Sequence, residues 1–153
     1  MDALTPSYRM LCSQAQALLS GYAHAVANAA NLSALIFQQL PDLNWVGFYF
    51  LEGDELIVGP FQGKPACVRI PMGKGVCGTA AATAQTQRVD AVHAFEGHIA
   101  CDAESRSEIV VPLYADGSLI GVLDIDSPSP SRFGPEDQAG IEALAKIYID
   151  SLC

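Results

Sequence analysis

The sequence has few basic residues, with 8 Lys and Arg against 17 Asp and Glu in 153 residues. The resulting net charge of −9 repels a phosphate backbone, which argues against nucleic acid as a partner. No apolar run approaches the roughly 20 residues that a membrane helix needs. The first residues also lack the basic start and continuous apolar segment of a signal peptide. We therefore expect a cytoplasmic protein that binds neither nucleic acid nor membrane.

The sequence also lacks a C-x-x-C pair, and its five cysteines are an odd number. Such a set does not predict a disulfide framework in a reducing compartment. His98, Cys101 and Cys77 offer three zinc ligands, but their spacing matches no common zinc module, so no metal is expected. Cys12 falls in an amphipathic helical stretch and Cys153 ends the chain, so both are interpreted as incidental to function.

Half of the residues are apolar, and the chain is long enough to bury a core, so residues 1–153 are expected to form a single domain. Apolar periodicity predicts two helices within 5–40 and a final helix from Pro135. The polar, mixed stretch from 87 to 106 predicts a long loop. With hairpins between these helices, the pattern predicts an α+β fold whose antiparallel sheet is flanked by N- and C-terminal helices.

An aromatic stretch, NWVGFYFL, predicts a strand over residues 44–51, followed by a second strand over 55–59. Side chains alternate along a strand, so Trp45 and Tyr49 share one face. That face suits the wall of a ligand pocket, and packing beneath a helix explains it equally well. The opposite face is expected to be the core and carries Val46, Phe48 and Phe50.

A glycine-rich stretch follows a short strand, ACVRIP, that carries Cys67. Gly73, Gly75 and Gly78 match G-x-G-x-x-G at the start of a helix, but the neighbouring hairpins argue against a parallel dinucleotide-binding unit. The glycines still let backbone N–H groups at the helix N-terminus face an anion. Cys77 falls in the first helical turn, where the helix dipole favours a thiolate.

The stretch CDAESRSEIVVPLYADGSLIGVLDID predicts a second hairpin, with a type I′ turn at Asp116-Gly117. Its strands are apolar except for Glu108 on the first and Asp124 and Asp126 on the second. Burying a carboxylate without a partner is costly, so these acids either lie exposed at strand ends or form the floor of a polar pocket. Cys101 would then lie at the mouth of that pocket. The spacing leaves both interpretations open.

Four motifs resemble the free methionine-(R)-sulfoxide reductases, which are single GAF domains: NWVGFYF, GPFQGKPACVRIPMGKGVCGTAA, HIACDAESRSEIVVPL and GVLDIDSP. The resemblance extends from about residue 8 to residue 150. Its motifs are specific, because an ordinary GAF domain need not carry Cys67, Cys77 and Cys101 at these positions. It implies a GAF fold and reduction of free L-methionine-(R)-S-oxide to methionine.

The resemblance also implies a role for each site residue. Cys101 would attack the sulfoxide, Cys67 would resolve the product as a Cys67–Cys101 disulfide, and Cys77 could join the exchange. Thioredoxin would supply the electrons, without a metal or bound cofactor. The substrate pocket would be lined by Trp45, Tyr49, Glu108, Asp124 and Asp126.

The chemistry of these residue types is consistent with that assignment. Thiolate attack reduces a sulfoxide sulfur, and the oxygen leaves once it is protonated, so a nucleophilic cysteine and a nearby acid are needed. Clustered carboxylates supply the acid because like charges raise at least one pKa. Two alternatives remain open: a GAF module that binds a small regulator, and a thiol-based redox sensor. A homodimer is compatible with the sequence, which does not fix the oligomeric state.

Overall fold

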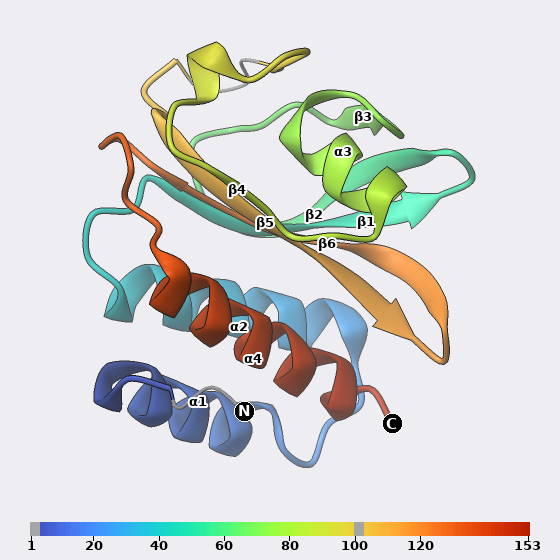
Figure 1. Ribbon diagram of the computed structural model, residues 1–153. Helices are drawn as coiled ribbons and strands as arrows, with labels where there is room; N and C mark the ends of the chain where they lie inside the picture. Colours follow the sequence, from blue (N-terminus) through green and yellow to red (C-terminus); the bar gives the residue numbers. More distant parts are fainter. Residues whose placement is uncertain (1–3, 100–102) are drawn as a thin grey trace.

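The computed structural model describes residues 4–99 and 103–153 (Figure 1). Within them, six strands form one antiparallel sheet in the order β3-β2-β1-β6-β5-β4. The strands are β1 (Trp45–Glu52), β2 (Glu55–Gly63), β3 (Arg69–Pro71), β4 (Gln87–Val89), β5 (Ser107–Ala115) and β6 (Ser118–Ser127). The sheet confirms the expected α+β class, with β1 and β6 at its centre.

Helices cover both faces of the sheet (Figure 1). Helices α2 and α4 pack on one face, with α1 beyond them, and α3 lies over the other. The helices are α1 (Pro6–Leu19), α2 (Ala25–Gln39), α3 (Gly75–Thr83) and α4 (Pro135–Ser151), and a short 3-10 helix, η1, spans Val92–Ala94. In the described residues, no helix is both long and apolar enough to cross a membrane.

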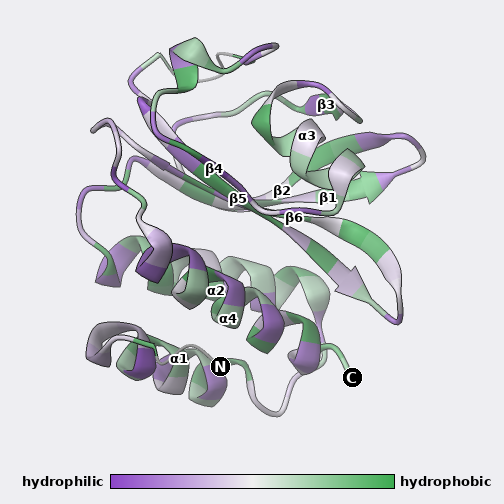
Figure 2. Ribbon diagram, viewed as in Figure 1, coloured by the Kyte–Doolittle hydropathy of each residue, from purple (hydrophilic) through white to green (hydrophobic). Residues whose placement is uncertain are grey.

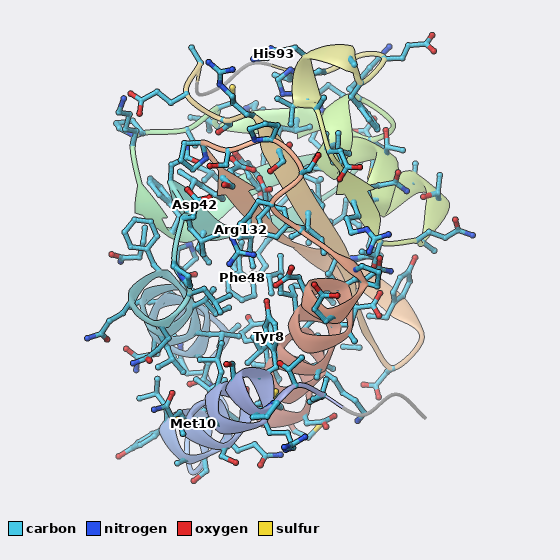
Figure 3. All side chains as sticks on the ribbon, turned by 60° about the vertical axis from the view of Figure 1, so that its left-hand side comes forward. Tyr8, Met10, Asp42, Phe48, His93 and Arg132 are labelled. Carbon is cyan, nitrogen blue, oxygen red and sulfur yellow. The ribbon has the colours of Figure 1, made fainter. Side chains whose placement is uncertain are left out.

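The core follows from the alternation of side chains along β1. Val46 and Phe48 are fully buried in the larger cluster, formed with α1, α2 and α4. Phe48 lies between the sheet and the helices, where its ring centroid is 4.7 Å from that of Tyr148 on α4 (Figure 3). Apolar and polar residues alternate along α4, as its mixed colouring shows (Figure 2). The predicted core face of β1 is therefore confirmed.

Trp45 and Tyr49 belong to a second buried cluster on the opposite face of the sheet, beneath α3. The sequence left two interpretations of these rings, a pocket wall and packing beneath a helix. Both hold, because the rings are nearly fully buried and also line a cavity.

The turn between β5 and β6, together with a one-residue register shift between Leu113 and Tyr114, sets the register that brings the acids together. Asp116 and Gly117 have φ of 53° and 79°, as the predicted type I′ turn requires. In the resulting register Glu108 pairs with Asp126, and Val110 pairs with Asp124. Residues two apart on a strand share a face, so the three acids share one face of the sheet. They lie on the α3 side.

The expectation of an unbroken loop over 87–106 is wrong. Residues 87–89 form β4 at the sheet edge, paired with β5 from Gln87↔Val110 to Val89↔Glu108. Three residues paired at an edge give too short a signal to be recognised in a polar sequence. The short strand predicted to carry Cys67 starts later, because β3 covers only Arg69–Pro71 and Cys67 lies just before it.

Candidate active site

Three carboxyl groups form the floor of a cavity beneath α3. Glu108 and Asp124 are 7% and 5% exposed, so the interpretation of acids lying exposed at strand ends is wrong for both. Asp126 is half-buried and lines the same cavity. Two of their oxygen atoms, Asp124 Oδ1 and Asp126 Oδ1, are buried without a hydrogen-bond partner in the described residues. Such groups are costly in a folded protein unless a ligand supplies the missing partner.

The environment of the acid cluster favours its protonated forms. Burial is the largest cause that raises the pKa of Glu108, and the charge of Asp124 is the next. Burial likewise raises the pKa of Asp124, followed by the charge of Asp126. Burial and then Glu108 raise the pKa of Asp126. These groups titrate as a coupled set, because adjacent negative charges oppose one another's ionisation. The cluster therefore suits a proton donor at neutral pH.

Cys77 lies in the first turn of α3, as predicted, and its thiol faces the acids. Its Sγ donates a hydrogen bond to Asp124 Oδ2 over 3.2 Å. The expectation that the helix dipole favours a thiolate here is wrong. Burial and then the charge of Asp124 raise the pKa of the Cys77 thiol, and these effects outweigh the dipole. Cys77 is therefore held as a thiol.

The aromatic wall also positions the chain segment that carries Cys67. Tyr49 Oη donates to the carbonyl of Cys67 over 3.2 Å, and Trp45 Nε1 donates to the carbonyl of Lys64 over 3.1 Å. The two rings lie 5.8 Å apart between centroids. Burial, followed by the charge of Asp124, raises the pKa of the Tyr49 hydroxyl, which keeps it a hydrogen-bond donor.

The N-terminus of α3 also lines the cavity. Lys74, Gly75 and Val76 line it there. The Gly75 N–H itself donates to the carbonyl of Gly97 over 3.1 Å, so it is already used. Val76 and Cys77 follow within the first turn, where backbone N–H groups have no carbonyl four residues earlier in the helix. Anion binding by these two N–H groups stays a prediction.

Two polar residues that the sequence reasoning missed support Asp126. Ser105 Oγ donates to Asp126 Oδ2 over 3.4 Å, and Asn44 Nδ2 donates to Ser105 Oγ over 3.0 Å. The first of these bonds counters part of the rise in the pKa of Asp126. Nothing in the motif around Ser105 distinguishes it from its polar neighbours, so only the fold could reveal the contact.

Of the predicted site residues, the structure brings Trp45, Tyr49, Cys77 and the three acids to one cavity of about 40 Å³. The flanking residues Pro65 and Ala66 line the same cavity. Cys67 is disulfide-bonded, whereas Cys12, Cys77 and Cys153 are free thiols. Cys101, the predicted nucleophile, lies outside the described residues.

Comparisons with known proteins show the family of this chain. The GAF domain family matches residues 13–147. Free methionine-R-sulfoxide reductase from Escherichia coli is 55% identical over 140 residues, covering 92% of this chain and 85% of that protein. The chain belongs to the free methionine-R-sulfoxide reductase family. The resemblance carried by the sequence motifs is thereby confirmed.

Other members of the free methionine-R-sulfoxide reductase family share both sequence and fold. The Saccharomyces cerevisiae enzyme of the same name is 47% identical over 140 residues, covering 86% of this chain and 78% of that protein. The Neisseria meningitidis reductase, solved by X-ray crystallography in complex with its substrate, is 42% identical in sequence to this chain. It superposes with a TM-score of 0.92 and covers 99% of this chain and 93% of that one.

Proposed function

We propose that this chain reduces free L-methionine-(R)-S-oxide to methionine, as the names of its relatives state for them. The observation that carries the proposal is the pairing of a buried acid cluster with the N-terminus of α3 across one small cavity. A free amino acid carries an ammonium and a carboxylate, and this cavity offers a partner of opposite character to each.

The proposed binding mode uses the unsatisfied groups of the cavity. The ammonium donates to the acid cluster, where Asp124 Oδ1 and Asp126 Oδ1 are buried without partners in the described residues. The carboxylate accepts from the N–H groups of Val76 and Cys77 at the start of α3. Trp45 covers the S-methyl group.

The proposed reaction needs a nucleophile and an acid. The Cys101 thiolate attacks the sulfoxide sulfur, a carboxyl of the cluster protonates the oxygen, and that oxygen is transferred to the cysteine. The products are methionine and a Cys101 sulfenic acid, so the sulfoxide sulfur is reduced and the cysteine sulfur oxidised by two electrons. The Cys67 thiol then condenses with the sulfenic acid, forming a disulfide and releasing water.

A dithiol reductant, proposed here to be thioredoxin, returns the disulfide to two thiols. The disulfide-bonded state of Cys67 and the free thiol of Cys77 support Cys67 as the resolving residue. Burial of Cys77 and its raised pKa support only a secondary role in exchange, because a thiol is a poor nucleophile. We also propose that residues 1–153 form one GAF domain and that the protein works in the cytoplasm.

Substrate selectivity tests the proposed function. Purified protein with thioredoxin, its reductase and NADPH is expected to reduce free methionine-R-sulfoxide. N-acetylated and amidated methionine-R-sulfoxide should react at least about a hundredfold more slowly, because each block removes a charge-assisted hydrogen bond worth about 1.5–3 kcal/mol. Methionine appearance by chromatography and NADPH oxidation measure both rates, with the S epimer as the stereochemical control. Equal rates on free and blocked substrates would refute the binding mode, and no reduction of either would refute the function.

If Cys67 is the resolving residue, a variant without it should complete a single turnover but fail in multiple turnover. Without reductant, the pre-reduced Cys67→Ser variant should still form about one equivalent of methionine per chain. With thioredoxin its steady rate should fall at least about tenfold, because the sulfenic acid lacks its partner thiol. The matched variant Cys77→Ser should retain the Cys67–Cys101 link in a mass map of substrate-treated protein. A dominant Cys77–Cys101 link in the unmodified protein would exchange the two resolving roles.

A further inference from the structure

One sulfur atom and two carboxylate oxygen atoms, all possible metal ligands, lie close together in the cavity beneath α3. Cys77 Sγ, a carboxylate oxygen of Glu108 and one of Asp124 all lie within 4.8 Å of one another. All three residues are buried. A four-coordinate zinc ion binds sulfur at about 2.3 Å and carboxylate oxygen at about 2.0–2.2 Å, so its ligands lie within this range of one another. The zinc ligands weighed from sequence, His98 and Cys101 with Cys77, are a different set.

Independent evidence for a ligand comes from the oxygen atoms that are not hydrogen-bonded. Asp124 Oδ1 and Asp126 Oδ1 are buried without a hydrogen-bond partner in the described residues, whereas the second oxygen of each carboxyl accepts from Cys77 and Ser105, respectively. Both residues line the cavity of about 40 Å³, which has room for an ion. A buried, unpartnered carboxylate oxygen is a group that a cation stabilises.

The charge of the cluster is not compensated by ion pairs in the described part of the chain. The ion pairs found there involve Glu104, Glu55, Asp137 and Asp150 and leave out all three cavity acids. Lys74 lines the cavity at the start of α3 but forms none of these pairs. The cavity therefore combines carboxyl groups that have no cationic partner in the described residues with a sulfur ligand.

We propose that Cys77, Glu108 and Asp124 form a binding site for a thiophilic divalent cation of the zinc class. The ion displaces to solvent the Cys77 proton and any proton that Glu108 or Asp124 holds. A sulfur–metal bond replaces the sulfur–hydrogen bond, and water or Asp126 completes the coordination. The sulfur ligand disfavours Mg²⁺ and Ca²⁺, which prefer oxygen ligands alone. The ion is not a cofactor of the proposed reduction. The ion occupies the position assigned above to the substrate ammonium. This overlap rests on the proposed function, whereas metal binding does not depend on it.

Cobalt provides the test, because a thiolate–Co²⁺ bond absorbs strongly in the near ultraviolet. The protein is used with its disulfide intact and with Cys12→Ala and Cys153→Ser, which remove the other described free thiols. Titration with Co²⁺ should produce this absorption with saturation at one equivalent, and Zn²⁺ should abolish it by displacement. Cys77→Ser in the same background should lose the absorption entirely.

Asp124→Asn provides a second variant that keeps the side-chain shape and the thiol. It should weaken Co²⁺ binding at least about tenfold, whereas the same substitution at the exposed Asp116 should leave the affinity unchanged. Circular dichroism checks that each variant is folded, and the Asp124 variant decides the question if Cys77→Ser does not fold. The proposal is overturned if the unsubstituted cavity gives no near-ultraviolet absorption, if Cys77→Ser retains it, or if Asp124→Asn binds as tightly as the parent.

Discussion

The Cys101→Ser variant is expected to lose turnover of free methionine-R-sulfoxide by at least about a thousandfold, the largest effect that we expect from any single substitution. A serine hydroxyl remains protonated at neutral pH and cannot accept the sulfoxide oxygen to form a sulfenic acid. The loss should persist with a small dithiol in place of thioredoxin, because the first chemical step is removed. Methionine release under both reductants measures it.

Two other cysteines serve as controls for this substitution. Cys12 is buried in α1 within the larger core cluster, and Cys153 is exposed at the chain end. Cys12→Ala and Cys153→Ser should each retain at least about half of the activity, since neither residue lines the cavity beneath α3. Substantial turnover by Cys101→Ser under a small dithiol would assign the nucleophile to another cysteine.

The hairpin turn and the two faces of β1 could be predicted from the sequence because alternation and turn chemistry are local. The Asp116-Gly117 turn could be recognised from its dipeptide, but the turn alone does not place Glu108 opposite Asp126, because that pairing also needs the one-residue register shift between Leu113 and Tyr114. The faces of β1 follow from alternation alone, with Trp45 on the α3 side and Phe48 in the core. These predictions needed no knowledge of distant contacts.

Properties that depend on burial and on distant contacts could not be predicted in this way. The helix dipole was a local reason to expect a thiolate at Cys77, but desolvation and Asp124 act in the opposite direction and are stronger. The chain from Asn44 through Ser105 to Asp126 joins residues up to 82 positions apart by side-chain hydrogen bonds, which no motif encodes. Strand β4 is similarly defined by its partner β5 more than by its own composition.

The acid cluster is expected to lower the stability of the fold while supporting turnover, so Asp124→Asn should change both quantities. Turnover should fall about 10²–10⁴-fold, because the variant disrupts the coupled carboxyls that protonate the leaving oxygen and bind the ammonium. The carbonyl oxygen of asparagine can still accept from Cys77 Sγ. The ionisable group that burial penalises is removed, so the variant should be more stable than the parent at pH 7.

The sign of the pH dependence follows from the raised pKa of Asp124 in the folded protein. A group whose pKa is raised by folding stabilises the folded state below its unfolded pKa, about 4, and that contribution is lost as pH rises through the folded value. The stability advantage of Asp124→Asn should therefore be largest at pH 7 and should shrink towards pH 4. Urea unfolding midpoints at the two pH values measure it.

Asp116→Asn provides the matched control, because it makes the same chemical change in the turn of the same hairpin. Asp116 is exposed and has a positive φ that asparagine also accepts, so neither turnover nor the urea midpoint should change appreciably at either pH. An Asp124→Asn variant that is inactive and less stable than the parent at pH 7 would instead assign Asp124 a structural role through its bond with Cys77. A variant that is inactive and more stable would show that Asp124 lowers the stability of the folded protein but is needed for turnover. This is expected of a carboxyl group whose unpartnered oxygen binds the substrate.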